Sequence, residues 1–327
     1  MKRTVSLTLV FLLLLAALLP GCGKTAPAAP PAEDKLSIVT TIFPVYDWVR
    51  NLLGERASAV ELTMLLDSGV DLHSYQPTVE DMVKISGCDL FIYVGGESDG
   101  WVDDALREAA NKDMIVINLL ETLGDSVKEE ELVEGMEAEE EEDEDEEGPE
   151  YDEHVWLSLR SAGAICTALA EALARLDPAH AEDYAANAAA YAEKLDALDG
   201  AYRAAVDAAP GKTLLFGDRF PFRYLVDDYG LSYYAAFVGC SAETEASFET
   251  VVFLAQKTDE LGLRTICQIE SADGSIARTI RENTRDKDQQ ILSFDSMQSV
   301  TAEDVAAGKT YLGIMEENLA VLREALQ

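Results

Sequence analysis

The chain of 327 residues carries 62 Asp and Glu against 25 Lys and Arg, which gives a formal net charge of −37 at pH 7. This acidic balance excludes nucleic acid and anionic lipid as binding partners, because their phosphates would be repelled, and it makes cations the natural counterpart. The length is sufficient for two lobes with separate cores.

The first 22 residues have the features of a secretion signal. A positively charged start precedes an apolar run from Val5 to Leu19, which is shorter than the roughly 20 residues that a transmembrane helix needs. The run ends in Leu-Pro-Gly-Cys, with the cysteine at position 22. This ending resembles the processing site of bacterial lipoproteins, which implies that Cys22 carries the lipid. An ordinary signal peptide or a membrane anchor is the alternative.

Residues 23–35 are rich in Pro and Ala and poor in side chains that could fill a core. Such a composition predicts an extended tether. Together with the signal at 1–22, it predicts an extracytoplasmic protein whose soluble body is lipid-anchored to the bacterial cell membrane.

From residue 36 onward, short runs rich in Val, Ile, Leu and aromatic residues alternate with segments of helical periodicity. Each run predicts a strand, and the alternation predicts largely parallel sheets flanked by helices, in an N-terminal α/β lobe (36–176) and a C-terminal α/β lobe (211–327). The C-terminal segment 309–327 predicts an amphipathic helix. The eight predicted strands are 36–43, 59–66, 89–95, 114–120, 213–217, 232–238, 265–270 and 289–294.

Between the two lobes, residues 177–209 predict one long rigid helix. Asp177 and Pro178 form a typical helix start, a capping side chain followed by proline at the first helical position. About 30 residues at 1.5 Å each give a rod of roughly 45 Å, long enough to join two lobes. The alternative is a helix that packs on one lobe only. The apolar face consists of Tyr184, Tyr191, Leu195, Leu198 and Tyr202.

Residues 128–150 form a block of like charges without apolar periodicity. Such blocks are solvated, so we expect a disordered acidic loop within the first lobe. Two interpretations stay open: a surface loop with no specific task, or a weak collector of cations, since a row of carboxylates offers no fixed coordination geometry.

The chain contains only three histidines, and two of them lie in similar polar contexts. His73 stands in Asp-Leu-His-Ser-Tyr-Gln-Pro and His154 in Asp-Glu-His-Val-Trp-Leu-Ser. Neutral imidazole is the commonest side-chain ligand for divalent transition metals, so the pair predicts a metal site. The third histidine, His180, is expected to be exposed near the start of the long helix.

Besides Cys22, four cysteines are present, and none shows the Cys-x-x-Cys spacing of a thiolate zinc site, which argues against such a site. In an exported protein they leave room for one or two disulfides, whose pairing the sequence does not decide. They are Cys88, Cys166, Cys240 and Cys267.

Residues 36–327 resemble the solute-binding lipoproteins of ABC transporters for zinc or manganese, a cluster of zinc-binding and adhesin-like lipoproteins. The resemblance implies two lobes joined by one rigid helix, with a metal in the cleft between them. It also implies a monomeric carrier, not an enzyme, that delivers the metal to a membrane ABC permease. A secreted metallohydrolase, for which no His-Glu-x-x-His motif appears, and a surface adhesin with a structural metal are the alternatives. The segments that carry the resemblance include TTIFPVYDWVRNLLG, LHSYQPTVEDM, EHVWLS, GDRFPFRYLVDDYGL and ETEASFETV.

Carried over residue by residue, the resemblance implies that His73 and His154 are the two metal ligands of the N-terminal lobe. No histidine occurs after residue 180, so the C-terminal lobe departs from the common pattern. Asp218, at the predicted end of the strand 213–217, becomes the candidate third ligand, although a helix cap or an ion pair with a neighbouring arginine is its alternative role. Glu270, which ends the strand 265–270, is the candidate carboxylate ligand.

Asp273 and Glu243 are the second choices for the carboxylate, and Asp273 has the alternative role of capping a helix that begins at Ser275. A carboxylate in place of a third imidazole shifts the donor set toward manganese, whereas the general affinity order favours zinc. We therefore expect Zn²⁺ ahead of Mn²⁺.

Overall fold

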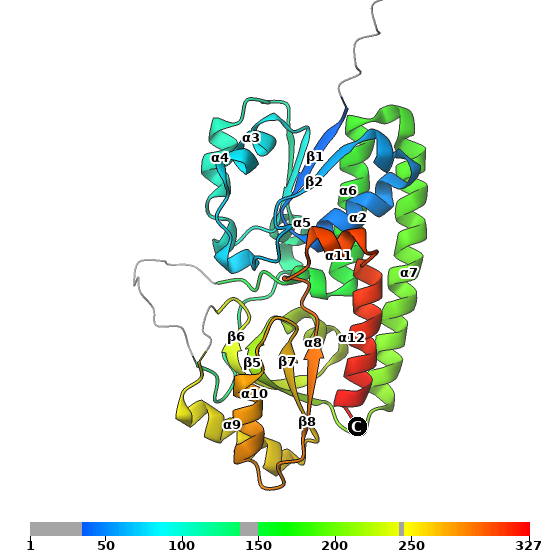
Figure 1. Ribbon diagram of the computed structural model, residues 1–327. Coiled ribbons are helices and arrows are strands. Elements are labelled where there is room, and N and C mark those ends of the chain that lie inside the picture. The colour runs from blue at the N-terminus through cyan, green and yellow to red at the C-terminus, as the bar shows by residue number, and fades with distance from the viewer. Residues whose placement is uncertain (1–34, 138–149, 242–244) are drawn as a thin grey trace, which may run out of the picture. The chain divides into compact units, whose positions relative to one another are not determined.

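Two four-stranded sheets form the frame of the computed structural model, which describes residues 35–137, 150–241 and 245–327 (Figure 1). A strand forms at each of the eight predicted runs, which confirms the eight strands, although the strand that begins at Thr213 extends beyond its predicted end. The strands are β1 (Ser37–Thr40), β2 (Glu61–Met64), β3 (Leu90–Tyr93), β4 (Ile115–Asn118), β5 (Thr213–Phe220), β6 (Ser232–Val238), β7 (Thr265–Ile269) and β8 (Gln290–Phe294).

The two sheets have the same topology. The first lobe contains the sheet β2-β1-β3-β4 and the second lobe the sheet β6-β5-β7-β8, and all neighbouring strands are parallel. Parallel neighbours need crossover connections, which the helices provide. The carboxyl ends of the strands, where ligands bind in open α/β sheets, are followed by the segments that carry the predicted site residues.

Helices flank both sheets (Figure 1). Those in and around the first lobe are α2 (Phe43–Leu53), α3 (Val79–Gly87), α4 (Val102–Glu108), α5 (Leu119–Leu123) and α6 (Leu159–Leu176). They are followed by α7 (Ala181–Ala208), α8 (Arg223–Tyr229), α9 (Phe248–Leu261), α10 (Ser275–Asn283), α11 (Ala302–Ala306) and α12 (Tyr311–Ala325).

The predicted long helix is confirmed as α7, which has 28 residues and runs alongside both lobes (Figure 1). It packs against α2 of the first lobe and against α8 and α12 of the second. The five residues of its predicted apolar face are all buried. Burial of one face along its length explains why an alanine-rich segment forms a single helix here.

The predicted cap of this helix is wrong in detail. Pro178–His180 form a 3-10 turn before α7, and the Asp177 side chain caps no backbone N–H. Its carboxylate instead accepts hydrogen bonds from Tyr184 Oη (2.9 Å) and from the guanidinium of Arg56 (3.2 Å). Asp177 therefore anchors the start of the helix to the segment that follows α2.

Helix α10 packs closely on β5 at Gly217. A Cβ added to Gly217 would lie 2.7 Å from Ala277 Cα and 2.9 Å from Ala277 N. We expect Gly217→Ala to push the helix away and lower the free energy of unfolding by about 1–2 kcal/mol. Urea denaturation checks this, with Gly211→Ala as the control, because a Cβ on Gly211 meets no atom within 4 Å. Equal stability of the two variants would contradict the close approach.

Buried hydrogen bonds join the two lobes at Trp156. Its indole N–H donates to Ser296 O of the second lobe at 2.9 Å, and Tyr311 Oη donates to Trp156 O at 2.7 Å. Both rings are almost completely buried. Because each bond would have to break in a low-dielectric interior, they tie the lobes together.

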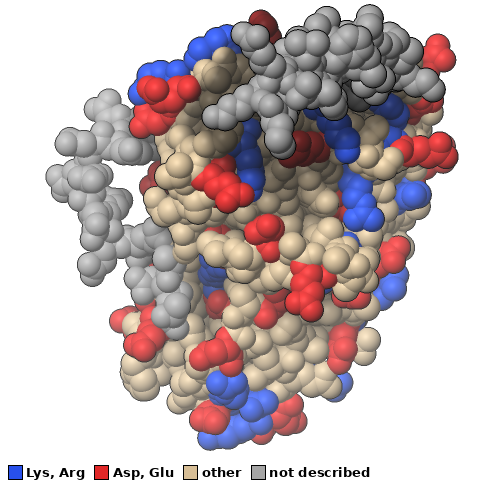
Figure 2. All heavy atoms as spheres, turned by 45° about the horizontal axis from the view of Figure 1, so that its top comes forward, with Lys and Arg blue, Asp and Glu red and all other residues tan. Residues whose placement is uncertain are grey.

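The described residues on either side of the acidic segment make backbone contacts with the rest of the chain. Glu129 pairs with Tyr151 and Glu137 with Phe237 of β6 through isolated backbone bridges. Positions 138–149 of the predicted disordered loop lie outside the described residues. They include nine consecutive acidic residues. Elsewhere, acidic and basic side chains are interspersed on a mainly neutral surface in the view of Figure 2.

The predicted signal (1–22), most of the tether (23–35) and Cys22 also lie outside the described residues. Within the described part of the chain, no helix combines the length and the apolar character that crossing a membrane demands. The four cysteines at 88, 166, 240 and 267 are free thiols.

Candidate metal centre

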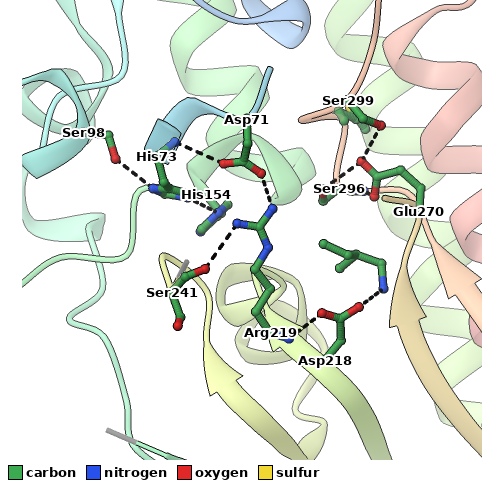
Figure 3. A network of polar contacts seen from close by, with 12 residues as sticks. Asp71, His73, Ser98, His154, Asp218, Arg219, Ser241, Glu270, Ser296 and Ser299 are labelled. Carbon is green, nitrogen blue, oxygen red and sulfur yellow. Dashed lines mark hydrogen bonds and ion pairs between the residues drawn. The ribbon is translucent and has the colours of Figure 1, made fainter. Parts of the chain in front are cut away.

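The two predicted histidines meet, although 81 positions separate them in the sequence (Figure 3). His73 lies in a 3-10 turn, Leu72–Ser74, after β2, and His154 immediately precedes another, Val155–Leu157. Their Nε2 atoms are 3.1 Å apart. The side chains are 6% and 0% exposed, so this pair is buried at the carboxyl side of the first sheet.

The same local turn holds both histidines. An aspartate stands two residues before each, and its Oδ1 accepts a hydrogen bond from the histidine backbone N–H: Asp71 from His73 at 3.1 Å, and Asp152 from His154 at 2.8 Å. Aspartate favours such turns because its short side chain reaches the backbone two residues on. The repeated Asp-x-His pattern therefore fixes both imidazoles by one mechanism.

Polar partners of the two Nδ1 atoms orient the rings so that their Nε2 atoms face each other. His154 Nδ1 lies 3.0 Å from Asp152 Oδ1, and His73 Nδ1 lies 2.7 Å from Ser98 Oγ and 3.5 Å from Glu153 Oε2. Carboxylate neighbours favour the Nδ1–H tautomer, which leaves the Nε2 lone pair for a metal. Two lone pairs facing across 3.1 Å repel each other, and a cation between them would remove that repulsion.

Burial, followed by the nearby His154, lowers the pKa of His73 to about 3. The imidazole of His73 is therefore neutral at physiological pH. A neutral imidazole is the form that binds a metal, so no proton competes for this nitrogen.

The ring of His154 packs against Trp156, and their ring centroids lie 5.1 Å apart. The glycine at position 96, with φ of +83°, lets Glu153 approach the site from the other side, because an added Cβ would lie 2.4 Å from Glu153 Oε1. The first lobe thus surrounds the imidazoles with an aromatic wall and a buried carboxylate.

A third donor, Cys240, was not identified from the sequence. Among the residues that the structure describes, the potential ligand atoms of His73, His154 and Cys240 all lie within 4.8 Å of one another. Burial, together with the charges of Asp152 and Glu130, raises the pKa of the Cys240 thiol, so it is protonated without a metal. The absence of Cys-x-x-Cys spacing hid this residue, and the only sequence signal was its position after a strand of the second lobe.

Asp218 does not end a strand, as the sequence suggested, because β5 continues to Phe220 after a register shift between Phe216 and Arg219. Its carboxylate accepts hydrogen bonds from the backbone N–H groups of Arg219 (2.9 Å) and Ile269 (3.1 Å). Burial raises its pKa. The bond to Ile269 holds Asp218 beside the carboxyl end of β7.

Glu270 follows β7 directly, and its carboxylate is enclosed by donors. Oε2 accepts from Ser296 N at 2.7 Å, and Oε1 accepts from the hydroxyls of Ser296 (3.0 Å) and Ser299 (3.1 Å). Burial, followed by the charge of Asp295, raises its pKa. Asp218 and Glu270 thus lie at the carboxyl side of the second sheet, and neither belongs to the group of ligand atoms formed by the two histidines and Cys240.

The second-choice carboxylates have different positions. Asp273 is exposed, and its Oδ1 accepts a hydrogen bond from Ser275 N at 2.7 Å, which is the helix-capping role considered as its alternative. Glu243 lies outside the described residues. His180 hydrogen-bonds to Asp183 on the surface, as expected of a histidine without a role in the site.

Arg219 connects the two lobes. Its guanidinium donates to the carboxylate of Asp71 in the first lobe and, at 3.5 Å, to Ser241 O. In Figure 3 the guanidinium lies between the histidines on one side and Glu270 on the other. The positive charge of Arg219 also lowers the pKa of His73, as a lesser cause than burial, so it acts on the centre of the site.

The chain is similar to known proteins of one family. A model of the ZnuA family, described as zinc-uptake complex component A, periplasmic, matches residues 38–325. The zinc-binding lipoprotein AdcA of Streptococcus pneumoniae is 32% identical over 296 residues, which cover 90% of this chain and 56% of that protein. The chain therefore spans about half the length of such relatives.

One further protein and one solved domain structure match along nearly their whole length. The high-affinity zinc uptake system protein ZnuA of Bacillus subtilis is 28% identical, with 94% of each chain covered. The crystal structure of the Zn(II)-bound ZnuA-like domain of Streptococcus pneumoniae AdcA has a TM-score of 0.70 and 29% identity, and the match covers 89% of this chain and 99% of that one. The matched family model spans both lobes, and this chain belongs to the ZnuA family of periplasmic zinc-uptake components.

Proposed function

We propose that this protein captures a divalent transition metal outside the cytoplasm, zinc ahead of manganese, and delivers it to the permease of an ABC transporter. The observation that carries the proposal is the pair of buried imidazoles whose Nε2 atoms lie 3.1 Å apart. Zn–N bonds of about 2.0–2.1 Å in a tetrahedral site place two ligand nitrogens about 3.3 Å apart. The pair therefore has nearly the spacing that one zinc ion requires.

The proposed ligands are His73 and His154 from the first lobe and a carboxylate, Asp218 or Glu270, from the second. Both carboxylates are half-buried at the carboxyl side of the second sheet, near the ends of β5 and β7. To reach a metal, either one has to exchange hydrogen bonds with its backbone or serine donors for a metal bond. Such an exchange makes release by a partner protein feasible, since the donors remain available to take the carboxylate back.

The relatives support transport of zinc in preference to catalysis. AdcA is named a zinc-binding lipoprotein and ZnuA of Bacillus subtilis a protein of a zinc uptake system. A hydrolase needs an open metal position and a general base beside it. We propose a monomeric carrier whose partner is a membrane permease, with lipid on Cys22 anchoring it to the membrane. Cys22→Ala, which should release the protein from the membrane fraction of cells, tests the anchor.

Native mass spectrometry of the protein with equal concentrations of Zn²⁺ and Mn²⁺ tests the proposal. We expect one bound ion per chain, predominantly zinc. In cells, deletion of the gene should reduce zinc uptake at low external zinc, and the wild-type gene should restore it. A protein that holds no ion, or a deletion that leaves uptake unchanged, would refute the transport role. In the second case a bound metal would be structural, as in an adhesin.

Arg219 places a positive charge beside the proposed metal. We expect Arg219→Gln to bind zinc about tenfold more tightly, because a unit charge a few ångströms from a divalent cation costs about 1 kcal/mol or more at a protein surface. Competition with a chelator measures the change. Arg223→Gln is the control, because Arg223 pairs with Glu131 and Asp227 and contacts neither histidine. Weaker binding by Arg219→Gln would show that the arginine acts mainly by bracing Asp71.

A further inference from the structure

Cys240 occupies the position in the second lobe that faces the histidines. It follows β6 after a single residue, Gly239, and it is half-buried. Its Sγ lies within 4.8 Å of the ligand nitrogens of His73 and His154. In a tetrahedral site with a Zn–S bond of about 2.3 Å, sulfur and nitrogen ligands stand about 3.5 Å apart. A shift of about 1 Å is therefore enough to bring all three atoms to bonding distance.

The turn that carries Cys240 is held directly against His154. A Cβ added to Gly239 would lie 3.0 Å from His154 Cε1, 3.1 Å from His154 Nδ1 and 2.9 Å from Phe220 O. Only a residue without a side chain permits this approach of the backbone to the ring. The close approach positions the thiol of the next residue beside the imidazole pair.

The carboxylates of the second lobe face the two histidines less directly than Cys240 does. Glu270 accepts three hydrogen bonds from Ser296 and Ser299, and Asp218 accepts two from backbone N–H groups. The guanidinium of Arg219 lies between Glu270 and the histidines (Figure 3). A metal held by the two imidazoles would thus contact Cys240 before either carboxylate.

We propose that the thiolate of Cys240 is the third protein ligand of the metal, and that it selects zinc against manganese. This inference rests on the proposed function and adds a ligand to it, so that one carboxylate completes four-coordination. Thiolate is a soft ligand that suits zinc, whereas manganese prefers oxygen donors. Binding replaces the S–H bond by an S–Zn bond, and the proton passes to solvent, so no oxidant or reductant takes part.

Alkylation of the wild-type protein tests the inference without any substitution. Iodoacetamide is added with and without one equivalent of Zn²⁺, and modification is located by peptide mass spectrometry. Because its thiol is half-buried and its pKa is raised, we expect Cys240 to react slowly in the metal-free protein, over hours at alkaline pH, and bound zinc to slow this reaction about tenfold or more further. The buried thiols Cys88, Cys166 and Cys267 serve as internal controls for unfolding. Equal reactivity of Cys240 with and without bound zinc would overturn the inference.

Cobalt provides a spectroscopic test of the same bond. Co²⁺ in place of zinc should give visible ligand-field bands and a near-ultraviolet sulfur-to-metal charge-transfer band. Cys240→Ser should lose the charge-transfer band but keep the ligand-field bands, and should bind zinc about tenfold more weakly or worse with manganese binding unchanged. Cys166→Ala, a change in the core of α6, should behave as wild type.

The two proposals fail in different ways. Ligand-field bands without a charge-transfer band in the wild-type protein would mean that a metal binds at the histidines without sulfur, which refutes the role of Cys240 alone. No cobalt or zinc binding in the wild-type protein would refute the proposed function itself.

Discussion

His154→Ala and His73→Ala should each lower the affinity for zinc by about a hundredfold or more, because each removes one imidazole from a site whose ligands together contribute about 10–16 kcal/mol in zinc-binding domains. The double variant should bind zinc no more tightly than a surface carboxylate cluster does. Titration against a fluorescent zinc chelator of known affinity measures the loss.

His180→Ala is the matched control, since it removes the remaining histidine of the chain from the surface turn that precedes α7. It should bind zinc as the wild-type protein does. If the two site variants retained wild-type affinity, the pair at 3.1 Å would not be the metal site, and both proposals above would be lost.

Asp99→Asn should change the dependence of stability on pH. Burial, followed by the charge of Glu153, raises the pKa of Asp99 to about 7, and its Oδ2 accepts hydrogen bonds from the backbone of Val94 and Gly95, both at 2.9 Å. The folded state therefore holds a proton that the unfolded state releases above about pH 4. Wild-type stability falls as pH rises from about 4 to about 7, and Asn at this position removes that loss.

Relative to wild type, Asp99→Asn should thus gain roughly 2–3 kcal/mol of stability between about pH 5 and about pH 8. Urea denaturation of the metal-free proteins at both pH values gives the difference. Asp103→Asn, at an exposed position of α4, controls for the loss of one negative charge from the chain. A stability difference that is the same at both pH values would show that Asp99 ionises normally in the folded state.

The strands and the long helix could be predicted because their signals are local. Parallel strands covered on both faces appear as continuous apolar runs, and β3 (Leu-Phe-Ile-Tyr) is of this kind. The end of β5 could not be predicted in the same way. Gly217 and the two charged residues after it resemble a turn, yet the ladder to β6 resumes at Arg219 after the register shift.

The histidines could be found because the chain has so few and because both stand two residues after an aspartate. Cys240 and the pairing of Arg219 could not be found, because they depend on contacts between the lobes. Arg219 and Asp71 are 148 positions apart, and with 62 acidic residues in the chain the sequence does not single out one partner. Spacing motifs reveal metal ligands only when the ligands lie in one local segment.

The indole of Trp156, with its ring 5.1 Å from that of His154, gives the protein an intrinsic fluorophore beside the histidine pair. The emission of a buried indole responds to the charge on a neighbouring imidazole. Uptake of a cation by His154 should therefore be visible in the tryptophan emission of the unlabelled chain, and the rate of capture could be followed in a stopped-flow instrument.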